Sequence, residues 1–455
     1  ALPISLLEDA SHQPFAGVYA THMLANDHPD ISVRLRRLLE AIKLVYASTY
    51  HRSAKSYVSA TPNSIEDEQM AVVVQELVGN EVNGRFYPQI SGAARSHNHY
   101  PVAPLQSEDG MAAICIGLGR QVAMGGKCLR YSPGQPKRIH QFHSTEAILE
   151  SSQRKFYAIP MIEEDGEVYS DEEKNLELFD LEIAELDGVL SLVGSTYVVS
   201  DDRIVDSIMV AGGPRLVTFA PILKHGRFPL SEILHHVLST CESYLGSPVE
   251  IEFAVNIDNE TNKRKFALLQ VRTMMDDSVD IDIDLTEVDR ESAVVISSKS
   301  LGNGVIDDIR DVVYVNPSKL DRMRTTNLTD EIEAIDAILR KQKRPYLLIG
   351  PGRWGSSDPS LGIPVEWNQI MGAKAIVEVP MSDIHVEPSQ GTHFFQNIVS
   401  FNIGYLTIGH DDLVDWDWLD SYEPETKFGP LRHVRIEKPL KVILDSRDSE
   451  ALVLR

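Results

Sequence analysis

The sequence predicts an α/β protein with more than one domain, and three observations support this fold class. Residues 249–272 alternate between apolar and polar side chains, which is typical of β-strands. Residues 30–60 carry apolar side chains at helical spacing. Residues 312–316 and 346–350 are strand-like and flank a helical segment at 330–341. The chain has 455 residues, which is enough for two or three domains.

The composition is that of a folded protein with an acidic surface. Hydrophobic residues make up 43% and charged residues 24% of the chain, which is ordinary for a soluble globular protein. The formal net charge of -24 argues against nucleic acid or an anionic membrane as a main partner. The sequence has no apolar run of about eighteen residues, no signal peptide, and three cysteines without metal-binding or disulfide spacing. We therefore expect a cytoplasmic location.

Residues 30–60 predict the first helix. Its apolar positions recur at helical spacing and predict a buried face. The basic residues between them predict a face in contact with solvent. The apolar positions are Val33, Leu35, Leu38, Leu39, Ile42 and Val45, and the basic positions are Arg34, Arg36, Arg37 and Lys43.

Three segments between this helix and residue 249 are also informative. Residues 70–78 form an apolar run that predicts a buried strand, interrupted by Gln75. A buried amide requires hydrogen-bond partners, which are either a ligand or the backbone of a neighbouring strand. The glycines of residues 117–126 suit a tight turn or a close approach to a ligand. Residues 230–244 predict a helix.

Residues 249–272 predict an antiparallel hairpin with one polar side. In the first strand, Glu250 and Glu252 alternate with apolar residues and therefore share a face. In the second strand, Gln270 and Arg272 share a face, and the polar residues 256–265 form the connection. We expect Glu252, Gln270 and Arg272 to converge on one side. The residues expected on the other side are Val249, Ile251, Phe253, Val255, Ala267, Leu269 and Val271.

The polar side of this hairpin suits a complex of Mg²⁺ with a nucleotide triphosphate. A carboxylate and an amide oxygen, such as those of Glu252 and Gln270, are hard ligands for Mg²⁺. A guanidinium such as that of Arg272 can hold phosphate oxygens through two hydrogen bonds. The alternative is an edge hairpin whose polar face contacts only water.

The chain after the hairpin predicts a linker and a second α/β domain. The acidic stretch at residues 276–291 is typical of a domain linker. Residues 350–362, GPGRWGSSDPSLG, are dense in turn-forming residues. Their backbone amides and Arg353 could bind an anion, and the alternative is a structural loop.

Four stretches resemble, in order, the nucleotide-binding domain of the phosphoenolpyruvate synthase and pyruvate phosphate dikinase family. They are SLLEDASHQPFAGVYAT at residues 5–21, MAVVVQELV at 70–78, GLGRQVAMGG at 117–126, and VEIEF followed by LLQVR within 249–272. In that family the domain is of the ATP-grasp type. The resemblance therefore predicts a partial ATP-grasp region at residues 1–275, the linker at 276–291, and a separate α/β domain at 292–455.

The resemblance also implies a function, which is ATP-dependent phosphotransfer with ATP and Mg²⁺ as cofactors. A small molecule, pyruvate by resemblance, would accept the phosphoryl group, and a homodimer is an assembly to test. The implied metal ligands are Glu252 and Gln270. Arg272 would hold phosphate, Gly17 and Thr21 would lie beside the phosphates, and Gln75 would lie near the base.

Two departures from the family pattern favour a non-catalytic alternative, a module that senses nucleotide or acts as a scaffold. Leu2 stands where the family has an arginine. The lysine-bearing lobe that precedes this region in the family does not precede it here, so the chain is either a piece of a longer protein or has lost that lobe. Because each lost charge-assisted contact costs about 1.5–3 kcal/mol, we expect this chain to bind Mg-ATP weakly or not at all.

His393 is a candidate phosphoryl carrier in the C-terminal half. Residues 364–379 resemble a run in the swivelling phosphohistidine domain of the same family, which precedes the phosphorylated histidine. Here residues 389–404 occupy that place, and His393 directly follows Thr392. We expect Thr392 to cap a helix that starts at His393. The alternative is a buried structural histidine.

Overall fold

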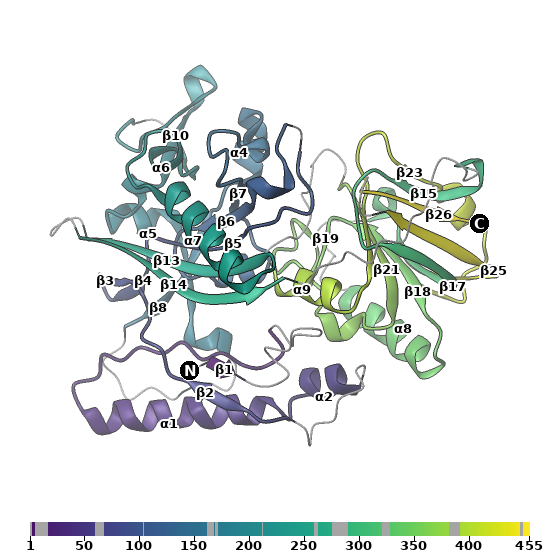
Figure 1. The fold of residues 1–455 in the computed structure, drawn as a ribbon, viewed down its shortest axis with the longest axis horizontal. Helices are drawn as coiled ribbons and strands as arrows, with labels where there is room; N and C mark the ends of the chain where they lie inside the picture. Colours follow the sequence, from purple (N-terminus) through teal and green to yellow (C-terminus); the bar gives the residue numbers. More distant parts are fainter. Residues whose placement is uncertain are drawn as a thin grey trace. The chain divides into compact units, whose positions relative to one another are not determined.

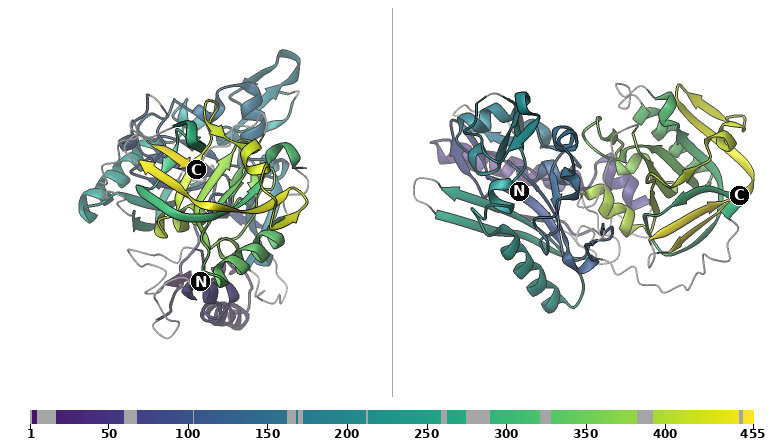
Figure 2. Two further views of the ribbon diagram at one scale, coloured as in Figure 1. Left: turned by 90° about the vertical axis from the view of Figure 1, so that its right-hand side faces the viewer. Right: turned by 90° about the horizontal axis from the view of Figure 1, so that it is seen from above.

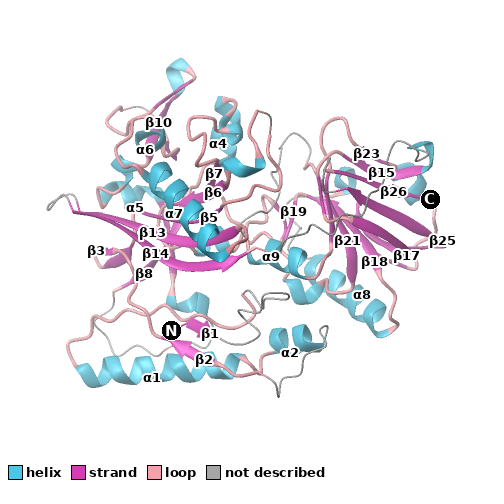
Figure 3. Cartoon of the chain, in the orientation of Figure 1, coloured by secondary structure: helices cyan, strands magenta, loops and turns pink. Residues whose placement is uncertain are grey.

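The chain forms two compact units, Ala1–Met274 and Met275–Arg455, in a computed structural model (Figure 1). The structure describes residues 2–4, 17–59, 68–102, 104–161, 168, 172–211, 213–258, 263–274, 290–320, 328–381, 392–445 and 449–455. Each unit combines helices with strands, so the α/β class is confirmed (Figure 3).

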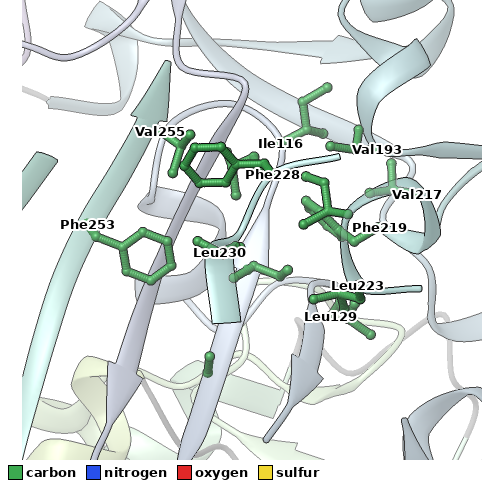
Figure 4. Packing of buried hydrophobic residues seen from close by; sticks show 14 of the residues in the cluster. Ile116, Leu129, Val193, Val217, Phe219, Leu223, Phe228, Leu230, Phe253 and Val255 are labelled. Carbon is green, nitrogen blue, oxygen red and sulfur yellow. The ribbon is translucent and has the colours of Figure 1, made fainter. Parts of the chain in front are cut away.

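The first unit is built on a five-stranded antiparallel sheet with the order β14-β13-β5-β6-β7. One face of this sheet lies against α7 (Leu230–Leu245), the helix expected at 230–244. Phe253 and Val255 cluster there with Phe228 and Leu230 (Figure 4). The strands are β5 (Ile90–Arg95), β6 (Met111–Cys115), β7 (Leu129–Tyr131), β13 (Val249–Asp258) and β14 (Lys263–Thr273).

Two smaller sheets and several short helices complete this part of the first unit. The four-stranded sheet contains β3 (Asn80–Val82), β4 (Arg85–Tyr87), β8 (Lys155–Pro160) and β9 (Glu177–Asp180). The three-stranded sheet contains β10 (Gly194–Val198), β11 (Arg203–Val205) and β12 (Arg215–Val217). The helices are α3 (Arg120–Ala123), α4 (Thr145–Ser151), α5 (Leu181–Leu186) and α6 (Ala220–Leu223).

The segment at 30–60 differs from the single amphipathic helix that we expected. It contains α1 (Ile31–Ser48) and α2 (Arg52–Ser59), and Asp30 caps the first of them. Leu35 and Leu39 are exposed, at 54% and 48%. Arg37, expected on the solvated face, is buried 3.8 Å from Asp27. The buried face consists of Arg37, Ala41, Val45 and Ser48, so it is rotated relative to the face that we expected, which it shares only at Val45.

The prediction of a buried strand at residues 70–78 is wrong. The structure has only a short strand, β2 (Ala71–Val73), which pairs with β1 (Leu2–Ile4) in a two-stranded sheet. Val73 and Val74 are exposed, at 38% and 56%. Apolar composition predicted burial, but a two-stranded sheet does not cover both faces of its strands.

The hairpin of β13 and β14 is confirmed, with a β-bulge that the alternation did not predict. Glu252 pairs with Gln270, whereas the next residue, Phe253, pairs with Leu268. Leu269 is therefore the extra residue on β14, and it reverses the alternation beyond it. As a result Phe266, rather than Ala267, lies on the same side as Phe253, and the two rings stack with their centroids 5.4 Å apart. The strands also extend into the expected connection, of which residues 259–262 lie outside the described residues.

The second unit contains a ten-stranded mixed sheet, seen from two further sides in Figure 2. β17 (Gly304–Val315), β18 (Tyr346–Pro351), β21 (Ala373–Val379) and β22 (Gly404–Thr407) run parallel to one another. The strand expected at 312–316 lies in β17 except for its last residue, the strand expected at 346–350 lies in β18, and the expected helix is α8 (Thr329–Lys341). These three elements are confirmed.

Antiparallel strands continue this sheet on both sides of the parallel part. They are β15 (Ala293–Ser297), β16 (Ser300–Leu301), β23 (Leu413–Val414), β24 (Thr426–Phe428), β25 (Leu431–Asp445) and β26 (Glu450–Leu454). The remaining elements are β19 (Arg353–Trp354) paired with β20 (Gly362–Ile363), α9 (His393–Ser400) and α10 (Trp416–Asp420).

Candidate functional site

The second face of the five-stranded sheet carries the predicted polar side chains. In an antiparallel pair, residues directly opposite each other project to the same side. Glu252 is opposite Gln270, and Glu250 is opposite Arg272. Ile251 and Phe253, which alternate with the glutamates, are buried in the core on the other face. The convergence of Glu252, Gln270 and Arg272 is therefore confirmed, while their binding of a ligand stays a prediction.

Gln270 and Arg272 contact each other directly on this face. With its amide oxygen turned toward Arg272, Gln270 accepts hydrogen bonds from Nε and Nη2 of that guanidinium, each 2.9 Å long. The bulge at Leu269 comes just before these two residues on β14. Because a bulge increases the local twist, it reorients the strand where the two polar side chains begin.

Arg95 is a site residue that sequence reasoning missed. It lies on β5 opposite Glu250, and its Nε donates to the Glu250 carboxylate in an ion pair that is almost fully buried. This pair neutralises one of the two glutamates on β13. The one sequence feature that could have indicated it is that Arg95 is a charged residue at the end of a run of mostly small residues, 90–95.

Glu252 is the carboxylate on this face that its surroundings destabilise. Burial raises its pKa, Arg272 opposes that rise, and the charge of Glu250 adds to it. No hydrogen bond from another described residue reaches the Glu252 carboxylate. A half-buried anion with few donors gains most from a bound cation, because the cation supplies the stabilisation that water no longer provides.

Small residues separate Glu252 from the far edge of the sheet. Glu252 is opposite Ala93 on β5, and Ala93 is opposite Ala113 on β6. Both alanines are buried in a small cluster that includes Val122 of α3. The glycine-rich segment at 117–126, which contains α3, therefore packs on the same face of the sheet as the glutamates.

Gly17, Thr21 and Gln75 lie in the N-terminal part of the first unit. Gly17 has a φ of 69°, a conformation that favours glycine. Thr21 is half-buried in the loop before α1. Gln75 is exposed and follows β2, so it is not the buried strand amide that we expected. Neither β1 nor β2 belongs to the five-stranded sheet.

His393 is the first residue of α9 in the second unit, as expected. Thr392 caps this helix, because its hydroxyl accepts a 3.1 Å hydrogen bond from the backbone N–H of Phe395. The His393 side chain is half-buried, whereas Phe394 and Phe395 are buried. Its role as a phosphoryl carrier stays a prediction.

The turn-rich segment at 350–362 is folded into the second unit. Arg353 and Trp354 are buried, and the backbone N–H of Trp354 donates to Oε1 of Glu378 over 2.9 Å. A Cβ atom on Gly355 would lie 2.3 Å from the ring of Phe394. The glycine at this position is therefore required by close packing against α9. Anion binding by Arg353 stays a prediction.

A second cluster of candidate ligands lies in the second unit. Single ligand atoms of Asp311, Glu425 and His433 all lie within 4.8 Å of one another. Asp311, however, is already bonded to His433 Nε2 at 2.8 Å and to Arg344 Nε at 2.9 Å. The cluster therefore contains its own cation.

Comparison with known families supports the interpretation of the first unit. The profile described as pyruvate phosphate dikinase, AMP/ATP-binding domain, matches residues 4–291. Domains of this family are of the ATP-grasp type and bind adenine nucleotides. No curated protein matches the chain. None of the helices that the structure describes is long and apolar enough to cross a membrane.

Proposed function

The chain belongs to the pyruvate phosphate dikinase AMP/ATP-binding domain family, and on that premise we propose that it binds ATP as its Mg²⁺ complex on the polar face of β13 and β14. One observation carries this proposal. Glu252, Gln270 and Arg272 project from neighbouring strand positions to the same side, and Glu252 is a carboxylate with a raised pKa. This combination suits a dication bridged to phosphate.

Each polar residue has a distinct role in this proposal. Glu252 and Gln270 would hold Mg²⁺, and Arg272 would hold phosphate oxygens. The Arg95–Glu250 ion pair fixes β5 against β13 beside them. The other proposed contacts are those of Gly17 and Thr21 with the phosphates and of Gln75 with the base.

The proposed activity is ATP-dependent phosphotransfer to a small molecule. Such reactions depend on positioning of the phosphates and on electrostatic stabilisation, which Mg²⁺ and arginines supply. Pyruvate is the acceptor to test first, and His393 is the proposed intermediate carrier. In the first step a ring nitrogen of His393 would form an N–P bond while the O–P bond to the rest of ATP breaks, and the rest of ATP would leave. In the second step an oxygen of the acceptor would form an O–P bond while the N–P bond breaks, the acceptor's proton would pass to water, and the imidazole would be free again.

A non-catalytic nucleotide sensor is the second candidate, and one observation favours it. Leu2, at the position of the family arginine, lies in β1 opposite Val73. An aliphatic residue there supplies no charge to a phosphate. A sensor would bind nucleotide with the residues of β13 and β14 but would not turn it over.

Two measurements on the full chain test the proposal. Because Leu2 supplies no charge to a phosphate, binding of ATP should be weak, so calorimetry is carried out at millimolar nucleotide. It should show binding that requires Mg²⁺ and that Glu252→Gln weakens further, whereas Glu232→Gln, at an exposed position of α7, should leave it unchanged. Release of phosphate or AMP in the presence of pyruvate then separates the enzyme from the sensor. Absence of Mg-ATP and AMP binding at millimolar concentration would overturn both candidates.

A further inference from the structure

Arg130 lies on the same sheet face as the candidate site, in the same row of side chains. It is opposite Ala113 on β6, which is opposite Ala93 on β5, which is opposite Glu252 on β13. The neighbours of Arg130 on β7, Leu129 and Tyr131, are buried in the core on the other face. The row thus runs from Gln270 on one edge strand to Arg130 on the other.

The guanidinium of Arg130 is buried without a partner for two of its nitrogens. Arg130 is only 7% exposed to solvent. Within the described part of the chain, Nε and Nη2 of Arg130 donate to no acceptor. The backbone N–H of Arg130 is satisfied by Oε1 of Gln141 at 2.9 Å, so the unmet donors are those of the charged group.

Three other inward-facing arginines of the first unit have carboxylate partners. Arg85 bonds Asp187 at 2.7 Å, Arg215 bonds Glu185 at 2.8 Å, and Arg95 bonds Glu250. A guanidinium does not lose its proton in proteins, so Arg130 cannot reduce the cost of burial by becoming neutral. A buried, unpaired charge is strongly unfavourable. An anion bound beside the guanidinium would offset this cost.

We propose that Arg130 is a phosphate-binding residue of this sheet face. The inference rests on the proposed function, because it assigns to the same site a second cation in addition to Arg272. Three strand spacings separate Glu252 from Arg130, which is about 14 Å between backbones, and the two residues between them are alanines. The phosphate belongs either to the nucleotide or to the phosphoryl acceptor or its product. In either case Arg130 supplies positive charge that Leu2 does not.

A thermal-shift experiment on the full chain tests this role without requiring turnover. The variant is Arg130→Met, which keeps the length of the side chain and removes its charge. In phosphate-free buffer the variant should melt above the wild type, because a buried unpaired charge is gone. Inorganic pyrophosphate should raise the melting temperature of the wild type but not that of the variant. Arg138→Met, at a nearby exposed position, should behave like the wild type.

Three outcomes would overturn the proposal. The first is a lower melting temperature of ligand-free Arg130→Met, which would indicate a structural ion pair. The second is an equal pyrophosphate shift in both proteins. If Arg130→Met does not fold, Arg130→Lys, which keeps the charge, and Arg130→Gln, which removes it, take its place. The third outcome is then pyrophosphate binding that is unchanged in both of these variants.

Calorimetry with different ligands identifies the source of the phosphate. A tenfold or greater loss of Mg-ATP affinity in Arg130→Met, with AMP affinity unchanged, places a terminal phosphate of the nucleotide at Arg130. A loss confined to phosphoenolpyruvate places the phosphate of the phosphorylated product there. Wild-type protein that binds pyrophosphate through Arg130 but no nucleotide would support Arg130 and refute the proposed nucleotide function, so the two failures can be told apart.

Discussion

Glu252 in the first unit and Asp311 in the second are both carboxylates held away from bulk water on a sheet, but their surroundings are opposite. Burial raises the pKa of Glu252, and no hydrogen bond from another described residue reaches it. Burial alone would also raise the pKa of Asp311, but hydrogen bonds from His433 and Arg344 outweigh it and leave the pKa lowered. Among the described residues, Glu252 is stabilised only by the nearby charge of Arg272, whereas Asp311 accepts hydrogen bonds from two partners.

Whether a carboxylate already has hydrogen-bond partners distinguishes a ligand site from a structural network better than the spacing of its possible ligand atoms does. Asp311, Glu425 and His433 satisfy the spacing of a metal site. Arg344 nevertheless bonds both Asp311 and Glu425, with its Nη2 3.1 Å from Glu425, and Arg435 lies 3.7 Å from Asp311. Glu252, whose partners are weaker, is the better place for a cation from solution.

The largest expected effect is on Asp311. Asp311→Asn should lower the free energy of unfolding of the second unit by about 3–5 kcal/mol, because Arg344 and His433 would lose a buried counter-charge. Urea denaturation followed by a probe in the second unit measures this loss. Asp307→Asn, at an exposed position of the same strand, is the control. A loss equal to that of the control would contradict the comparison.

The second effect concerns Glu252 and is seen in binding. Glu252→Gln keeps the shape of the side chain but removes a charged metal ligand, so the affinity for Mg-ATP should fall about tenfold or more, which is about 1.4 kcal/mol. The ligand-free protein should keep or gain stability, since the removed charge was destabilised by burial. Calorimetry and thermal melting measure the two quantities. A marked loss of stability would show that Glu252 is a structural residue like Asp311.

The sequence predicted the polar side of the hairpin because alternation is a local property. Glu252 lies two residues after Glu250, and Arg272 lies two residues after Gln270, so each pair shares a face of its strand. The alternation of faces continues as far as the bulge. The bulge itself was not predictable, because Leu268 and Leu269 are the same residue type and either could have been the extra one. The buried strand at 70–78 failed for a related reason, since apolar composition does not reveal how many strands flank it.

Partners on distant strands were beyond sequence reasoning. Arg95 reaches Glu250 across 155 positions, and His433 reaches Asp311 across 122. The row that joins Glu252 to Arg130 depends on the register of four strands, which is set by the packing of the whole sheet. Sequence alone showed which residue types could bind a nucleotide, but not which of them retain unpaired charge.

The two carboxylates should also respond oppositely to pH. The lowered pKa of Asp311 contributes stability that is present above the ordinary value of 3.8 and is lost as the pH falls through the folded-state pKa. The raised pKa of Glu252 contributes stability that is present below the ordinary value of 4.5 and is lost as the pH rises through the folded-state pKa. The stability loss in Asp311→Asn should therefore shrink in acid, and so should the gain in Glu252→Gln.

Thermal melting of the wild type and both variants between neutral pH and pH of about 3 measures these differences, within the range that spans the ordinary carboxyl values. Comparison with the wild type at each pH removes the contributions of all other groups. Parallel curves for Glu252→Gln and the wild type would contradict a raised pKa for Glu252.

The smallest expected effect is the absence of metal binding at the Asp311 cluster. A dication among Asp311, Glu425 and His433 would have to displace the Arg344 guanidinium from Asp311, or lie within a few ångströms of that positive charge. Both arrangements are costly, because the charges repel each other in a partly buried place and Arg344 cannot become neutral. Adding Zn²⁺ or a chelator should therefore leave the melting of the second unit unchanged. A Zn²⁺-induced rise that disappears in His433→Gln would show that the cluster does bind metal, and that the spacing of ligand atoms rather than the presence of hydrogen-bond partners decides where cations bind in this protein.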